Sequence, residues 1–233
     1  MQLRAGESYS DADGVVSTNP VNKQSRYAQL TSLGKRQVVK RVAPALERML
    51  GTNPAWIWPS INSCSYQTAE ILTSVLGLGQ SRLVPEYSFL DPRGLGALDG
   101  QAMADIRPML QQGDASSELW RPPRGVFCAD ARSDAGPCAM SMLRMLSCQL
   151  SCQRSTRVQQ LVAGRAGYDG TPNESAQDVL VRVRQVISIT ETQYDEETIV
   201  FVAPDSTVLT VLQAALLGVD LRDHWALFYE CVS

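Results

Sequence analysis

The chain has 233 residues, 44% of them hydrophobic and 19% charged, with a formal net charge of −3 at pH 7. A chain of this length and composition can bury a core of ordinary size as one α/β domain, and it offers no basic face that would hold a nucleic acid backbone. No apolar run approaches the roughly 20 residues that a membrane-spanning helix needs, so we expect a soluble protein.

The first part of the chain alternates predicted strands and helices. Residues 2–4 predict the end of a short buried strand, which a turn at Gly6 joins to a polar loop. Apolar residues recur at helical spacing over 34–50 and predict a helix. We expect Thr31 to cap this helix and Pro44 to kink it.

The same alternation continues after residue 50. Residues 55–58 predict an aromatic-rich strand, and residues 65–76 predict a helix that is closed by Gly77. Residues 82–84 predict a third strand, which leads into a glycine-containing loop and a short helix.

The last part of the chain predicts two more helices and two more strands. The sequence TPNE at 171–174 combines a cap, a proline at the first helical position and the returning glutamate of a capping box, so we expect a helix from there to about residue 194. The apolar run 198–203 is typical of a central strand covered on both faces. Asp205 can cap a helix through residue 217, and residues 226–232 predict a final strand.

This order of elements predicts an α/β fold, a three-layer α/β/α sandwich with a mostly parallel sheet. Ligands of such sheets bind beyond the carboxyl ends of the strands. Residues 4–8, 59–65 and 204–207 each lie at the end of a predicted strand, so we expect them to line one shared cleft.

Residues 113–168 interrupt the pattern within a single domain spanning 1–233, and they predict a peripheral or disordered insertion. A retained sequence segment that is foreign to the fold is an alternative. Four of the six cysteines lie in this segment: Cys128, Cys138, Cys148 and Cys152. Their spacing lacks the close ligand pairs of zinc sites, so we favour reduced thiols in an intracellular protein over a metal site, and we expect no cofactor.

Three segments resemble the motifs of a known family. The opening MQLRAGES resembles the strand and turn Leu-x-Arg-His-Gly-Glu-Ser of the histidine phosphatase superfamily, which includes the phosphoglycerate mutases. The segment PSINSCSYQTAEIL resembles the family's Ser-x-x-x-Arg-Ala-x-Gln-Thr-Ala, and FVAPDSTVL resembles its Val-Ser-His-Gly segment. The resemblance implies a phosphoglycerate mutase-like fold, is closest to plant and green-algal proteins of this kind, and suggests a chloroplast rather than a cytosolic setting.

The resemblance also implies that the catalytic set is degenerate. In the family a histidine on the first strand attacks phosphorus, two arginines and a second histidine hold the phosphoryl group, and a carboxylate supplies the proton. Here Ala5 stands at the nucleophile, Cys64 at the second arginine and Pro204 at the second histidine. The chain has a single histidine, His224, so one imidazole cannot fill both histidine positions, and we expect it to have a structural role.

A few positions of the family's pattern are kept. The resemblance makes Arg4, Gly6 and Ser8 candidates for binding an anion, and it makes Glu86 a candidate proton donor. From the residues alone, Arg4 can equally form an ion pair with Glu7 or Asp205, and Glu86 can equally be a capping carboxylate. A thiolate nucleophile at Cys64 is disfavoured, because no arginine lies six residues later as in the cysteine phosphatases.

We therefore expect a catalytically degenerate protein that acts by binding, as a ligand sensor or a protein scaffold, rather than by phosphohistidine chemistry. The alternative is a slow or altered phosphomonoesterase that uses Arg4 and Glu86 to activate water. A third reading is a structural subunit of a larger assembly. The expected partner is a phosphorylated small molecule or a protein, not a nucleic acid, and the sequence leaves the oligomeric state open.

Overall fold

A computed structural model describes residues 1–116 and 173–227 of the chain. Within these ranges the sheet has three parallel strands in the order β1 (Gln2–Arg4), β3 (Thr198–Ala203) and β2 (Ala55–Pro59). The register places Leu3 and Pro59 opposite Val202. The apolar run of β3 thus lies at the centre of the sheet, as the sequence predicts.

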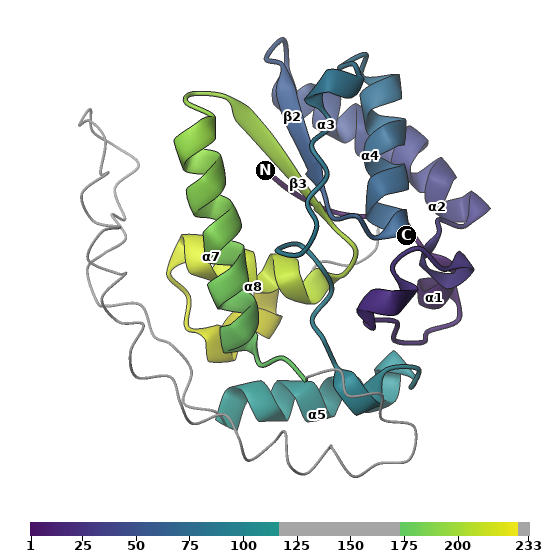
Figure 1. The fold of residues 1–233 in the computed structure, drawn as a ribbon, viewed down its shortest axis with the longest axis vertical. Coiled ribbons are helices and arrows are strands. Elements are labelled where there is room, and N and C mark those ends of the chain that lie inside the picture. The colour runs from purple at the N-terminus through teal and green to yellow at the C-terminus, as the bar shows by residue number, and fades with distance from the viewer. Residues whose placement is uncertain (117–172, 228–233) are drawn as a thin grey trace.

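Helices cover both faces of this sheet (Figure 1). On one face Val200 and Val202 of β3 pack with the π-helical turn Val38–Val42, which follows α2 (Ser32–Gln37), and with α3 (Ala43–Leu50) and α4 (Ser63–Val75). On the other face Phe201 and Ala203 pack with α7 (Ala176–Gln193) and α8 (Ser206–Leu217). Alternate residues of β3 therefore face opposite layers, which confirms the α/β/α sandwich.

The helix expected over 34–50 is divided into two. A π-helical turn, Val38–Val42, separates α2 from α3, and Pro44 is the second residue of α3. Proline has no N–H and its ring collides with the carbonyl four residues earlier, so the turn before Pro44 widens. The Thr31 cap is confirmed, because its hydroxyl accepts a hydrogen bond from Gly34 N at 2.9 Å.

The strand expected over 82–84 is reduced to an edge segment. Residues Gln80–Arg82 form a 3-10 turn, Leu83 makes an isolated parallel bridge to Ile57 of β2, and Glu86 makes another to Ser60, the residue after β2. The N–H groups of Val84 and Glu86 donate to carbonyls of β2 at 2.9 and 2.8 Å. Pro85 lies between them, on the side of the edge that has no neighbour in the described sheet, where the missing N–H costs nothing.

The helix expected from residue 171 begins later. Ser175 is the cap of α7 and exchanges hydrogen bonds with Asp178 in a capping box, so the box predicted at 171–174 is wrong. Glu174 instead pairs with Arg182 at 3.0 Å and accepts the N–H of Gly94 at 2.7 Å. The cap predicted at Asp205 is confirmed, since its carboxylate accepts Val208 N at 3.2 Å.

Two expectations about the rest of the chain need correction. Residues Leu221–Leu227 form a 3-10 helix, so the strand expected from residue 226 is wrong there, and residues 228–232 lie outside the described part. The insertion expected from residue 113 begins inside a helix, because α5 spans Met103–Ser116 and buries Asp114. The remainder of that segment, with its four cysteines, lies outside the described residues.

Neither a membrane-spanning helix nor a metal-binding cluster is present in the described part of the chain. No helix there is long and apolar enough to cross a bilayer. No group of three or more histidine, cysteine, aspartate or glutamate side chains there is placed to hold a metal ion.

Candidate functional site

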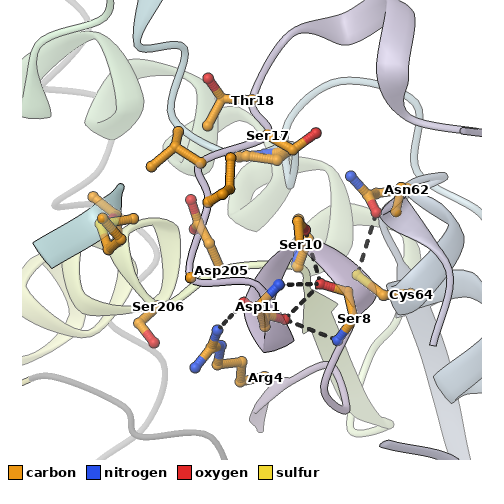
Figure 2. Close-up of a pocket in the computed structure, with 18 of the residues that line it drawn as sticks. Arg4, Ser8, Ser10, Asp11, Ser17, Thr18, Asn62, Cys64, Asp205 and Ser206 are labelled. Atoms are coloured by element: carbon orange, nitrogen blue, oxygen red, sulfur yellow. Dashed lines mark hydrogen bonds and ion pairs between the residues drawn. The ribbon is translucent and has the colours of Figure 1, made fainter. Parts of the chain in front are cut away.

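A pocket of about 460 Å³ lies beyond the carboxyl ends of β1 and β3. The three segments that the sequence predicts at this edge all contribute to it, through residues such as Arg4, Cys64 and Asp205 (Figure 2). Its lining is rich in hydroxyl and amide groups, which belong to Ser8, Ser10, Ser17, Thr18, Asn62, Ser206 and Thr207. Met103 and Arg107 of α5 and the indole of Trp225 complete the wall.

Ala5 follows β1 directly and belongs to the core rather than to the pocket. Its N–H donates to Ala203 O at 2.9 Å, and its side chain is 4% exposed and packs in the cluster that contains Leu30 and Val38. A methyl group at this position offers neither a lone pair nor a proton. The Ala5 side chain is therefore chemically inert.

Arg4 lines the pocket and forms an ion pair with Asp11, at 2.8 Å between Nη2 and Oδ1. The ion pair that the sequence allowed is thus present, but its partner is neither Glu7 nor Asp205. Glu7 instead accepts the hydroxyl of Thr31 at 2.7 Å. The Nε of Arg4 is buried and has no hydrogen-bond partner among the described residues.

Asp11 is a site residue that the sequence analysis missed. It belongs to the four-residue helix α1 (Tyr9–Ala12), and its other oxygen, Oδ2, accepts the N–H and the hydroxyl of Ser8 at 2.9 and 2.7 Å. The signal was available in the sequence, because Ser8 and Asp11 have the spacing of a capping box. Figure 2 shows the Asp11 carboxylate between Arg4 and Ser8.

Gly6 has a packing role and does not line the pocket. A Cβ at this position would come within 2.8 Å of Gly34 O, so the backbone approaches α2 too closely for any side chain. The N–H of Gly6 already donates to Thr68 Oγ1 at 3.1 Å. Of the three anion-binding candidates, the pocket therefore includes Arg4 and Ser8.

Cys64 lies in the pocket wall as a protonated thiol. Its Sγ donates to Asn62 Oδ1 at 3.2 Å, and burial raises the pKa of the thiol to about 12. Because the thiolate is the nucleophilic form, this side chain is inert near neutral pH.

Pro204 and Asp205 form the part of the wall that opens α8. The carboxylate of Asp205 caps that helix, and burial raises its pKa from the ordinary value of 3.8. A carboxylate at this point of the wall adds negative charge to the pocket, which opposes the entry of an anion.

Glu86 does not line the pocket. Its side chain is 6% exposed, and its two oxygens accept the N–H groups of Ser88 and Leu90, both at 2.8 Å. These are the bonds of a capping carboxylate. They confirm the structural reading of Glu86 and place the candidate proton donor away from Arg4's pocket.

His224 is fully buried in a polar cluster behind the pocket wall. Its Nδ1 lies 2.8 Å from Thr210 Oγ1 and its Nε2 lies 3.2 Å from Asp114 Oδ2. Arg93 binds Asp114 through two hydrogen bonds of 2.7 and 2.9 Å, and Trp225 Nε1 donates to the same carboxylate at 3.0 Å. Burial would raise the pKa of Asp114, but the bonds from His224 and Arg93 outweigh it and hold the pKa below its usual range.

Comparison with known proteins identifies the fold. No protein-family model and no curated protein matches the chain. Among solved structures, mycobacterial hydrolase 1 is similar with a TM-score of 0.60 and 20% identity, over 97% of this chain and 84% of that one. A mycobacterial glucosyl-3-phosphoglycerate phosphatase in complex with VO3 is similar with a TM-score of 0.59 and 18% identity, over 97% of this chain and 84% of that one. Bacillus stearothermophilus YhfR is similar with a TM-score of 0.57 and 18% identity, over 97% of this chain and 82% of that one. The fold is that of the phosphoglycerate mutase-like histidine phosphatases.

The three positions that the family resemblance singles out lie in different surroundings. Cys64 and Pro204 lie in the pocket wall as a protonated thiol and a proline ring, whereas the methyl group of Ala5 lies in the core. The sole imidazole of the sequence is held by Asp114 and Thr210 and has no exposed surface. The structure thus confirms the structural role expected of His224.

Proposed function

We propose that this chain is a catalytically degenerate protein with the histidine phosphatase fold, and that it binds a phosphorylated small molecule in its pocket without phosphohistidine chemistry. The observation that carries this proposal is the buried Ala5 at the end of β1, together with the enclosure of His224. Covalent phosphoryl transfer needs a nucleophile with an available lone pair next to the phosphate, and neither residue provides one there.

The pocket itself supports binding. A volume of about 460 Å³ is typical of small-molecule sites, and its hydroxyl-rich wall offers many donors and acceptors to a polar ligand. Such a concave site favours a small molecule over a protein partner. One solved structure of similar fold is named as a glucosyl-3-phosphoglycerate phosphatase, and that name supports a phosphorylated small molecule as the ligand class for this chain.

The rival function, a slow phosphomonoesterase that uses Arg4 and Glu86, receives less support. A general acid or base must reach the reacting oxygen, and the carboxylate of Glu86 is occupied by two backbone N–H groups outside the pocket lining. In addition, the guanidinium of Arg4 is already paired with Asp11.

One experiment on the full chain tests the proposal. The protein is incubated with a broad panel of phosphate monoesters, and both released phosphate and acid-labile, alkali-stable phosphoprotein are measured. We expect neither above the uncatalysed background. Turnover that disappears in Glu86→Gln but persists in Glu70→Gln, a matched change at an exposed glutamate of α4, would establish the rival enzyme. A trapped phosphoprotein adduct would overturn the proposal directly.

A second measurement addresses binding. The same compounds are screened for an increase in the thermal unfolding temperature, which reports ligands that bind the folded state. We expect a phosphorylated compound to stabilise the wild-type chain and to lose that effect in Arg4→Ala.

A further inference from the structure

Asp11 occupies the part of the pocket where an anion would meet Arg4. Its Oδ1 is 2.8 Å from Nη2 of Arg4, and both side chains are largely shielded from solvent, with exposures of 27% and 16%. A carboxylate oxygen and a phosphate oxygen make the same charge-assisted bond to a guanidinium. The position that an anionic ligand would take on this arginine is therefore filled by a group of the protein.

The two oxygens of Asp11 have different duties. Oδ2 accepts the N–H and the hydroxyl of Ser8 and thereby closes the capping box of α1. Oδ1 is bonded to Arg4. An incoming anion can therefore replace Oδ1 on the guanidinium while Oδ2 keeps the turn in place.

Arg4 retains unused binding capacity in this arrangement. Its Nε is buried and has no hydrogen-bond partner among the described residues, while its Nη2 is bonded to Asp11. A guanidinium presents adjacent N–H groups as a fork that suits two oxygens of one anion. The Arg4 guanidinium thus makes one hydrogen bond to Asp11, whereas it can hold a phosphate through two.

We propose that Asp11 is an internal competitor for the anion position on Arg4, so that a phosphate group binds there by displacing the Asp11 carboxylate. The competitor is tethered seven residues from Arg4, which gives it an effective concentration of about millimolar or higher. Free phosphate at a concentration below this effective concentration does not displace Asp11 from Arg4. A phosphorylated ligand therefore needs further contacts with the pocket wall to bind. This inference rests on the proposed function, because both place the ligand in the same pocket.

Titration calorimetry of inorganic phosphate into the full chain, at constant ionic strength, tests the inference. Asp11→Asn removes the charge but keeps an oxygen that can accept the N–H of Ser8. We expect this variant to bind phosphate at least about tenfold more tightly than the wild type, since a charge-assisted competitor is lost. Adding Arg4→Ala to Asp11→Asn should abolish the gain.

Asp13→Asn is the matched control, because Asp13 is exposed and lies two residues from Asp11, directly after α1. This change removes the same charge without touching Arg4, and we expect a change in phosphate affinity of less than about twofold, as for a screened surface charge. Equal affinities for the wild type and Asp11→Asn would overturn the inference. An equal gain in Asp13→Asn would also overturn it, because the effect would then be one of net charge.

Circular dichroism checks that Asp11→Asn is folded, and Asp11→Ser provides a second neutral variant if it is not. Failure of this inference is distinct from failure of the proposed function. The former is read from phosphate affinity in the variants, whereas the latter is read from turnover and phosphoprotein in the wild type.

Discussion

The buried cluster around Asp114 gives the sharpest test of how the fold is held together. In Asp114→Ala the guanidinium of Arg93 loses two hydrogen bonds and remains in a site where its side chain is 6% exposed. Breaking a buried ion pair by removing one partner costs about 3–5 kcal/mol, since the other charge stays buried without compensation. The N–H groups of Trp225 and His224 lose the same acceptor. We expect a loss of about 4 kcal/mol, a large share of the roughly 5–15 kcal/mol stability of a typical domain.

Urea unfolding followed by tryptophan fluorescence measures this loss. Asp220→Ala removes a more exposed partner, whose pair with Arg222 spans 3.1 Å, and should cost less than about 1 kcal/mol. Because the pKa of Asp114 is lowered in the folded state, its carboxylate stabilises the fold at pH values above 3.8, and this stabilisation is lost as the pH falls below 3.8. The difference in unfolding free energy between the wild type and Asp114→Ala should therefore become smaller in acid. A loss at pH 7 no larger than that of Asp220→Ala would refute the reasoning.

Three further changes have effects whose sign follows from the structure. Asp205→Asn keeps a helix cap but removes a carboxylate whose charged form is destabilised by burial, as its raised pKa indicates. In urea unfolding at pH 8 this variant should therefore be more stable than the wild type. The difference in stability should vanish as the pH falls to 3.8, because the wild-type carboxyl is then protonated in the folded state. Gly34→Ala would place a Cβ 2.2 Å from Glu7 O and should lower the free energy of unfolding by about 3 kcal/mol. At Gly113 in α5 the new Cβ meets open space, so Gly113→Ala should raise the free energy of unfolding by about 0.5–1 kcal/mol. Equal shifts of the thermal unfolding temperature for the two variants would contradict this. Ser175→Ala opens the capping box of α7 and should cost about 1 kcal/mol in the same unfolding assay, and an unchanged midpoint would show that the box contributes nothing.

The elements that the sequence predicts correctly are those with local signals. The apolar run of β3, the Thr31 and Asp205 caps and the helical spacing of α4 each depend on neighbouring residues, and the structure confirms them. The meeting of three strand ends at one pocket also follows from a general property of parallel sheets.

The start of α7 shows where local signals fail. Residues 171–174 and 175–178 both have the spacing of a capping box, so the sequence offers two starts to the same helix. The structure uses the second, because Glu174 is engaged by Arg182 and by the N–H of Gly94, about 80 residues earlier. A choice made by such distant partners leaves no trace in a short window of sequence.

The candidate site divides in the same way. The structure places Ala5 and Pro204 directly after β1 and β3 and Cys64 near the start of α4, while their assignment to the family's catalytic positions stays a prediction. The pairing of Arg4 with Asp11 was missed, although it spans only seven residues, because a capping pattern gives no indication of which cation the second carboxylate oxygen will meet.

Because His224 is buried and is the only histidine of the sequence, its chemical reactivity reports local unfolding of the protein. A reagent that acylates imidazole rings has one such target in the sequence, and the His224 side chain has no exposed surface in the folded state. The reagent can reach that ring only when the 3-10 helix Leu221–Leu227 separates from α5 and α8. The rate of acylation therefore reports how often this corner of the molecule opens, without any engineered label.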